Sequence, residues 1–279
     1  MSILKGNRIP LGPLLLLLPV IVCGIGGQVL CPHDPNGMDI SSSLKPPAWM
    51  AEGDWTHLLG TDHLGRDMLS RLIIGARTSL AVGLFGVGLA GLIGICLGMV
   101  AGYSEGKLDH LVMRIVDIQM SVPAILLTIL LAAVLGSGLN TIIISITVVF
   151  WTGYARVIRA ETLDIKQREF VIAARVIGSG SIRILIKHIL PNLVATIIVL
   201  ATLQLGRAII IEASLTFLGL GLQPPASAWG LIVSEGRNYL STAWWVPTFA
   251  GLAIMMTVLG TNLMGDWLRD KLDPRLRQL

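Results

Sequence analysis

The sequence predicts an all-α membrane protein that crosses the bilayer six times. Of its 279 residues, 53% are hydrophobic and only 14% are charged, whereas a soluble domain carries about a quarter charged residues. The hydrophobic residues are concentrated in runs of about 20, the length that an α-helix needs to span a bilayer. A net charge of +4 is compatible with nucleic-acid binding. However, the basic residues lie between the apolar runs, where they act as a topology signal.

The first predicted unit covers residues 1–76 and contains one transmembrane helix followed by a polar cap. The helix is expected at residues 11–30 and should remain uncleaved, because no small-residue cleavage site follows its apolar core. The next segment, about 45 residues long, is too long and too polar for a turn, so we expect an exposed extracytoplasmic cap. A helical pattern that starts at Asp67 predicts a short surface helix leading into the second span.

Cysteines and histidines predict neither a disulfide framework nor a metal site. The chain has three cysteines, an odd number, and Cys23 and Cys96 lie inside apolar runs as small hydrophobic residues. The spacing of His33, His57 and His63 matches no compact metal site, so we expect surface histidines and no bound metal.

The second predicted unit, residues 77–279, is a five-helix core. Glycines four apart, such as Gly94 and Gly98, indicate close packing between helices. Residues 102–114 read as a hydrophilic hairpin, and Pro123 is expected to kink the span that follows. The five transmembrane helices are expected at about 80–101, 115–135, 141–155, 193–213 and 246–264, the third of them extended by Arg156 and Arg159.

A polar stretch between the fourth and fifth of the six spans, residues 168–192, is patterned like two short helices. Apolar residues recur at spacings of three and four after Glu169, whose charge suits a helix N-terminus. Gly178 is placed for a left-handed C-cap, and Ser181 for the N-cap of a second helix that stops before Pro191. Two helices that meet at a Gly-Ser-Gly-Ser corner have a shape suited to a partner's groove.

Two ionisable residues lie within the fifth span. Arg207 and Glu212 are five residues apart and point about 140° away from each other on an ideal helix, so they are no natural same-face pair. A structural contact with a neighbouring helix or subunit and a role at a gate or pathway both remain open. Farther on, the aromatic residues of a second polar cap, residues 219–245, predict a helix at the membrane surface.

The distribution of positive charge predicts the orientation. Six spans place both termini on one face, and most of the 21 lysines and arginines, including Lys5, Arg8, Arg275 and Arg277, lie on that face. Because these residues collect on the cytoplasmic side, we expect the termini and the two-helix segment in the cytoplasm.

Three stretches resemble one family of transport proteins. The spaced residues of the two-helix segment resemble the cytoplasmic EAA signature of ATP-binding-cassette (ABC) importer permeases: Glu169, Ala173, Ala174 and Gly178, followed by His188-Ile189-Leu190-Pro191-Asn192. Two further stretches, Leu59 to Arg77 and Phe217 to Gly221 with Trp229-Gly230, look like the dipeptide, oligopeptide and nickel branch, in its C-type subunit. The resemblance covers about Leu59 to the C-terminus.

This resemblance implies a type I ABC importer permease fold in the bacterial inner membrane. It implies a homologous second permease chain as a heterodimer partner, two ATPase subunits that carry ATP and magnesium, and an extracytoplasmic solute-binding protein. The cargo would be a peptide, a peptide-like compound or a metal chelate. The coupling helices, at about residues 166–190, would dock on the ATPase through Arg168, Glu169, Ala173, Ala174, Arg175, Gly178, His188 and Pro191.

Other functions fit the sequence less well. The chain has no Gly-x-x-x-x-Gly-Lys-Ser/Thr motif, so we expect neither ATP hydrolysis nor a cofactor in this chain, which is then not an enzyme. The alternative, an ion-gradient-driven carrier, usually needs several ionisable groups at mid-membrane, and only Arg207 and Glu212 are candidates. An intramembrane protease is excluded because no predicted span contains a histidine.

Overall fold

The computed structural model describes residues 10–272. Within that range it is all-helical, with no β-strand, which confirms the predicted fold class. The α-helices are α1 (Leu11–Gly26), α2 (Met68–Ser104), α3 (Gly106–Met120), α4 (Ala124–Leu135), α5 (Leu139–Ile165), α6 (Glu169–Val176), α7 (Ser181–Ile184), α8 (Leu190–Phe217), α9 (Trp229–Gly236) and α10 (Trp245–Leu272). Short 3-10 turns lie at Gly27–Leu30, Ile40–Ser42 and Arg237–Tyr239, and a π-helical turn lies at Leu185–Ile189.

Among the described residues, five helices are long and apolar enough to cross a membrane. They are α1 with its 3-10 turn, α2, α5, the continuous helix from α7 through α8, and α10. The number becomes six if α3 and α4 together form one bent span.

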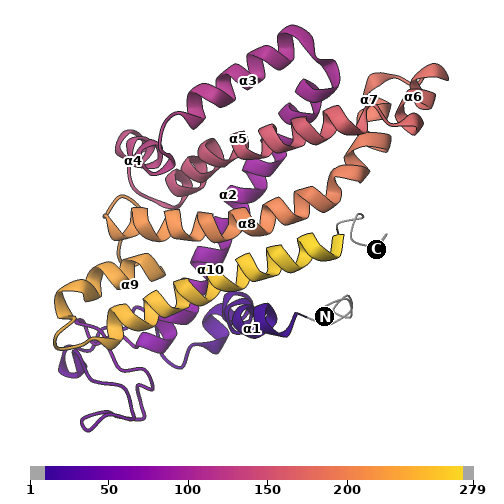
Figure 1. Ribbon diagram of the computed structural model, residues 1–279. Coiled ribbons are helices and arrows are strands. Elements are labelled where there is room, and N and C mark those ends of the chain that lie inside the picture. The colour runs from indigo at the N-terminus through magenta and orange to yellow at the C-terminus, as the bar shows by residue number, and fades with distance from the viewer. Residues whose placement is uncertain (1–9, 273–279) are drawn as a thin grey trace.

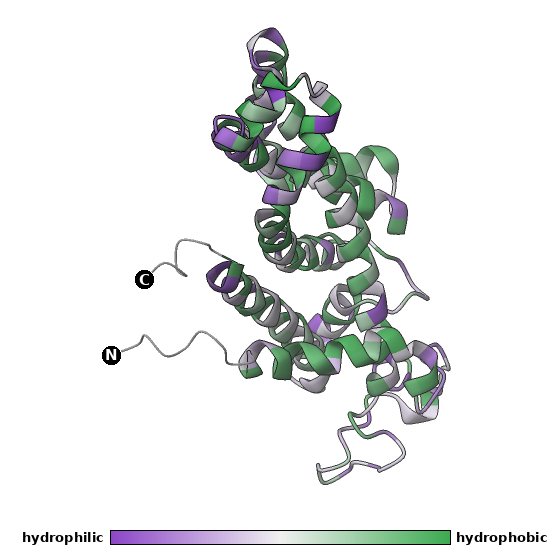
Figure 2. Ribbon diagram, turned by 90° about the vertical axis from the view of Figure 1, so that its right-hand side faces the viewer, coloured by the Kyte–Doolittle hydropathy of each residue, from purple (hydrophilic) through white to green (hydrophobic). Residues whose placement is uncertain are grey.

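Figure 1 shows how the helices are arranged: α2 packs against α5 and crosses behind α8 and α10, which lie below α5. The α6–α7 corner and the C-terminal end of α10 lie toward one side, and residues 31–67, here called the N-terminal cap, lie with α9 toward the opposite side. In Figure 2 hydrophobic residues cover most of the spanning helices, and hydrophilic residues gather in the upper part of the view and at the tip of α10.

Glycines allow α2 and α5 to pack closely, as the sequence predicted. A Cβ atom added at Gly98 would lie 2.6 Å from the carbonyl oxygen of Ala155. At Gly102 it would lie 2.7 Å from the carbonyl oxygen of Arg159. Both distances are well below van der Waals contact, so these positions admit no larger residue without a shift of the backbone.

The second span begins earlier than predicted. The expected surface helix and the span at 80–101 form one helix, α2, because nothing interrupts it: Met68 and Ala76 are buried, and the chain between them has no proline. Asp67 caps this helix, since its Oδ2 accepts a hydrogen bond from the Ser70 backbone N–H at 2.8 Å. The expected division at residue 76 therefore falls inside α2.

The segment predicted as the third span is divided between two helices and is not a single kinked helix. The predicted hairpin at 102–114 belongs largely to α2 and α3, and α3 meets α4 at an angle of 88°. Pro123 takes an extended conformation (φ −55°, ψ 129°) just before α4. Proline lacks an N–H donor and disfavours helical geometry in the residue before it, so the chain turns here instead of bending gently.

The prediction that the second short helix stops before Pro191 was wrong. The chain passes from α7 through the π-helical turn into α8 without a break, and Pro191 lies in the first turn of α8. The Leu190 N–H bonds the Leu185 carbonyl, a wider i to i−5 spacing. This shift lets the helix accommodate a residue with no N–H, and first-turn positions tolerate proline.

Candidate functional site

The corner formed by α6 and α7, residues 169–189, is fixed to the ends of three long helices. Its buried apolar side chains pack against the last turns of α2 and α5 and the start of α8. This cluster consists of Met99, Ile158, Ile165, Val171, Ala174, Ile184, Ile189 and Leu193. The corner is therefore packed against α2, α5 and α8 together.

The turn between the two helices has the predicted left-handed cap. Gly178 has a φ of +85°, a conformation that favours glycine. The Ser179 N–H bonds the Ala174 carbonyl and the Gly178 N–H bonds the Arg175 carbonyl, each at 3.0 Å, which together form a Schellman motif. The prediction for Ser181 was wrong, because Gly180 occupies the N-cap and Ser181 is the first residue of α7.

The outer face of the corner is apolar and exposed in this chain. The three- and four-residue spacing predicted that the apolar residues of the first short helix share one side. In the structure Val171 and Ala174 of α6 face the core, whereas other apolar residues point outward. Val176 is 81% exposed and Ile177 83%. The remaining large apolar residues of this face are Phe170, Ile172, Ile182 and Ile186. Exposed apolar side chains of this size are suited to a contact outside this chain.

The charged residues of the corner differ in what they contact. Arg168 forms an exposed ion pair with Asp164 at 3.0 Å, and Glu169 is exposed in the first turn of α6. The Arg175 guanidinium lies 5.5 Å from the centroid of the Tyr103 ring, so it turns back toward α2. Arg168, Glu169 and Arg175 are all exposed, and of the three Arg175 also stacks on an aromatic ring of this chain.

The remaining predicted coupling residues differ in exposure. Ala173 is exposed, but Ala174 is only 8% exposed and belongs to the chain's own core, so it does not present a slim surface to a partner. His188 is half-buried in the π-helical turn, where its carbonyl accepts a hydrogen bond from Asn192 Nδ2 at 2.7 Å. Pro191 is exposed at the start of α8.

Arg207 and Glu212 lie on different sides of α8, as the sequence predicted. Glu212 is fully buried, and its carboxylate accepts hydrogen bonds from Ser79 Oγ of α2 at 2.9 Å and Thr216 Oγ at 3.1 Å. Arg207 is exposed. Glu212 therefore links α8 to α2 within this chain, and Arg207 faces away from it.

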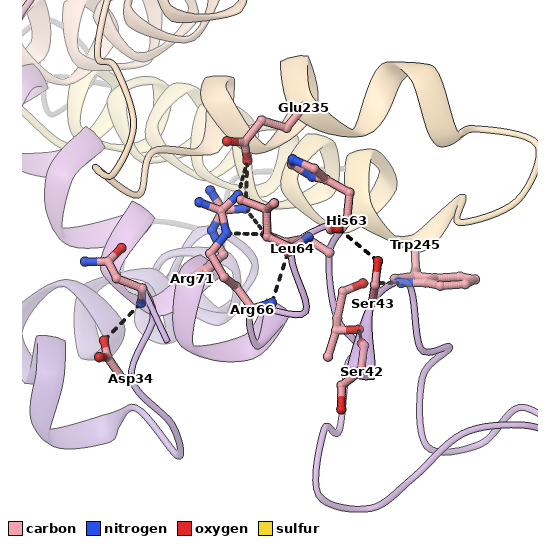
Figure 3. Close-up of polar contacts among 12 residues, drawn as sticks. Asp34, Ser42, Ser43, His63, Leu64, Arg66, Arg71, Glu235 and Trp245 are labelled. Carbon is pink, nitrogen blue, oxygen red and sulfur yellow. Dashed lines mark hydrogen bonds and ion pairs between the residues drawn. The ribbon is translucent and has the colours of Figure 1, made fainter. Parts of the chain in front are cut away.

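A buried ion-pair cluster in the N-terminal cap was missed by sequence reasoning (Figure 3). Arg66 contacts Asp62 at 2.6 Å and Glu235 of α9 at 2.9 Å, and Arg71 also contacts both carboxylates. Burial opposes ionisation of Asp62, but the Arg71 and Arg66 guanidinium groups outweigh it and hold the pKa of Asp62 below its usual value. Asp62, Arg66 and Arg71 all lie between Leu59 and Arg77, so their charges are visible in the sequence. Their partner Glu235 lies on α9, and sequence spacing does not reveal that contact.

Further hydrogen bonds join the same cap to α10 and connect its own segments. Trp245 Nε1 donates to the Thr61 carbonyl at 3.1 Å, and Ser43 Oγ donates to the His63 carbonyl at 2.9 Å (Figure 3). The N-terminal cap is thus a folded unit and not a loose loop.

Comparisons with known proteins agree with this architecture. Residues 94–278 match the sequence profile of the family described as binding-protein-dependent transport system inner membrane component. The chain is 43% identical to the di/tripeptide transport system permease protein DppC of Pseudomonas aeruginosa (strain UCBPP-PA14), over 97% of this chain and 89% of that protein. It is 41% identical to the glutathione transport system permease protein GsiD of Pectobacterium atrosepticum, over 94% of this chain and 86% of that protein.

A solved structure shares the fold. A chain of the inward-facing MetNI methionine ABC transporter superposes with a TM-score of 0.61 at 22% identity, over 74% of this chain and 98% of that chain. Permease subunits of binding-protein-dependent transporters are not catalytic and carry no cofactor, and the ion-gradient-driven alternative is set aside. The chain belongs to the binding-protein-dependent transport system inner membrane component family and is a multi-pass permease subunit of an ABC importer in the inner membrane.

Proposed function

We propose that this permease subunit carries short peptides or peptide-like compounds across the inner membrane. The observation that carries this proposal is near full-length similarity to permeases named for di/tripeptides, dipeptides and glutathione, all of which contain peptide bonds. Metal chelates remain the second cargo class. A separate binding protein would select the solute and deliver it to the extracytoplasmic side.

The assembly that fits this function contains several chains. A second, homologous permease would complete the pathway as a heterodimer partner, and two ATPase subunits would bind ATP and magnesium. The apolar outer face of the α6–α7 corner supports an ATPase contact, because a single protein chain rarely leaves so many large apolar residues exposed away from lipid. Membrane lipid would cover the spans, and no nucleic acid takes part.

The coupling residues would act in two ways. Arg168, Glu169 and Ala173 are exposed and would contact the ATPase directly. Ala174, Arg175, Gly178, His188 and Pro191 would hold the corner and its junction with α8 in the shape that transmits movement.

Arg207 would lie along the pathway or at the contact with the second permease. Arg207, Ile210, Ser214 and Phe217 follow one another at spacings of three and four, so they share one face of α8. The last three line an open cavity of about 440 Å³ between α4, α8, α9 and α10. Glu212 would hold α8 against α2. If α8 carries a gating residue, it would be Arg207.

The orientation that supports ATPase access has both termini and the corner in the cytoplasm. The excess of lysine and arginine on that side supports it. Four of these residues, Lys5, Arg8, Arg275 and Arg277, lie outside the described residues.

Transport by the reconstituted complex tests the proposal. Vesicles that contain both permeases and the ATPases, with binding protein on the opposite side, should take up a labelled dipeptide only with ATP and magnesium on the ATPase side. A proton uncoupler should not reduce uptake. Uptake of a nickel chelate but of no dipeptide would overturn the peptide assignment, and ATP-independent, uncoupler-sensitive uptake would overturn the mechanism.

A further inference from the structure

Two histidines and one aspartate form a cluster in the N-terminal cap, away from the α6–α7 corner. His33 follows the turn after α1, His57 lies in the middle of the cap, and Asp67 caps α2. One ligand atom from each residue lies within 4.8 Å of the others. Sequence spacing gave no sign of this cluster, because His33 and His57 come together only when the cap folds back on itself.

The carboxylate of Asp67 is held so that one oxygen faces both imidazole rings. Its Oδ2 accepts hydrogen bonds from the Ser70 N–H at 2.8 Å and from Ser70 Oγ at 2.7 Å. Its Oδ1 lies 3.0 Å from His57 Nδ1 and 3.7 Å from His33 Nδ1. Ser70 Oγ also accepts a hydrogen bond from the His33 backbone N–H at 3.1 Å. Hydrogen bonds that orient a ligating carboxylate are a regular feature of metal sites.

The distances suit a small transition metal ion. Ligand atoms bound to tetrahedral zinc at about 2.0–2.1 Å lie about 3.3 Å apart, and the two observed separations, 3.0 and 3.7 Å, lie on either side of this value. Two imidazole nitrogens and one carboxylate oxygen favour zinc and its neighbours over calcium or magnesium, which prefer oxygen ligands. The His33 side chain is 40% exposed, so an ion can enter from solvent and water can complete its coordination.

Neighbouring groups narrow the ligand set. Cys31 lies nearby but is not part of the cluster, because its thiol points to the backbone carbonyls of Gly27 at 3.5 Å and Ser70 at 3.6 Å. The ligand atoms that the structure brings together are therefore nitrogen and oxygen. A second group, Asp62, His63 and Glu235, is unsuitable because its carboxylates pair with the cationic Arg66 and Arg71.

We propose that His33, His57 and Asp67 bind a divalent transition metal ion of the zinc class, which fastens the N-terminal cap to the first turn of α2. The ion is structural and takes no part in ATP hydrolysis. Since the three ligands come from the end of the first span, the middle of the cap and the start of α2, bound metal stabilises the cap as one unit.

Zinc binding to the purified transporter complex tests the proposal. The complex is loaded with zinc, dialysed against metal-free buffer and analysed for zinc by elemental mass spectrometry. Zinc should be retained in stoichiometric amounts by the unmodified chain and by His63→Gln, and lost from His33→Gln and His57→Gln. Ser70→Ala, which removes an orienting hydrogen bond, should weaken binding about 10- to 100-fold. Cobalt should give the visible spectrum of a nitrogen and oxygen site.

The variants also separate metal binding from folding. His33 is partly exposed, so His33→Gln should assemble normally, as size-exclusion chromatography would show. Zinc should raise the Tm of the unmodified complex and not that of His33→Gln. Equal zinc in the unmodified chain and the His33→Gln, His57→Gln double variant would overturn the proposal. So would loss of zinc from His63→Gln alone.

Discussion

Arg66 and Glu235 form an ion pair at 2.9 Å although 169 positions separate them in the chain. Arg66 is 1% exposed and comes from the N-terminal cap, whereas Glu235 lies near the end of α9. The pair joins two segments that flank different membrane spans, so the cap and α9 should move as one body during transport.

The first prediction concerns the buried carboxylate at the centre of this cluster. Asp62→Asn should destabilise the protein by about 3–5 kcal/mol, because it leaves buried guanidinium groups without an adequate partner. Thermal unfolding of the purified protein measures the effect. Asp54→Asn, in the exposed part of the same cap, is the matched control and should leave the Tm unchanged. Equal Tm values for both variants would contradict the structural role of the cluster.

The second prediction concerns pH. The pKa of Asp62 is lowered in the folded protein, so its ionisation contributes stability that is present above the ordinary aspartate value of about 3.9 and is lost as the pH falls through the lowered value. The stability difference between the unmodified protein and Asp62→Asn should therefore be full at neutral pH and should narrow in strong acid. Unfolding series at several pH values would test this, and a difference that widens on acidification would refute it.

The third prediction concerns the cap of α6. Gly178→Ala should cost about 1–2 kcal/mol locally, because alanine disfavours the left-handed conformation. An added Cβ meets no atom within 4 Å at either Gly178 or Gly180, so the backbone effect is isolated from clashes. Gly180 has a φ of −65°, so Gly180→Ala is the matched control. Solute-stimulated ATPase activity of the complex should fall for Gly178→Ala and change much less for Gly180→Ala; the reverse order would contradict the role of this turn.

The fourth prediction concerns the packing of α2 on α5. Gly98→Ala should destabilise the bundle by about 1–3 kcal/mol through overpacking, because the new Cβ approaches a backbone carbonyl. Gly88→Ala, on the same helix, meets no atom within 4 Å and should be neutral or slightly stabilising through helix propensity. Thermal unfolding in detergent would compare them, and a Gly88→Ala protein as unstable as Gly98→Ala would show that propensity and not packing governs these sites.

Much of the fold was predictable because hydrophobic runs and cap residues act locally. The predicted spans correspond to α1, α2, α5, α8 and α10, and the left-handed turn at Gly178 was read correctly from one residue type in context. Two of the errors arose at proline. Pro123 broke a span and Pro191 did not, since the outcome depends on whether the surrounding backbone can shift to a wider turn.

The position of the α6–α7 corner was predictable from the sequence, but its side-chain geometry was not. The motif located the α6–α7 corner, yet only tertiary packing shows that Ala174 is buried while Val176 and Ile177 face outward. The cap clusters combine residues that are distant in sequence, and no local pattern pairs Arg66 with Glu235 or brings His33 to His57.

Co-purification of the ATPase with the tagged permease shows whether the α6–α7 corner is the docking surface. Val176→Glu and Ile177→Glu should each reduce the amount of ATPase that co-purifies by at least about tenfold, because burying an unpaired carboxylate costs more than the 1.4 kcal/mol that corresponds to that factor. Ile40→Glu, at an equally exposed apolar position of the N-terminal cap, should retain the ATPase fully. Full retention by the Val176 and Ile177 variants, or equal loss from Ile40→Glu, would contradict the assignment of the α6–α7 corner as the docking surface.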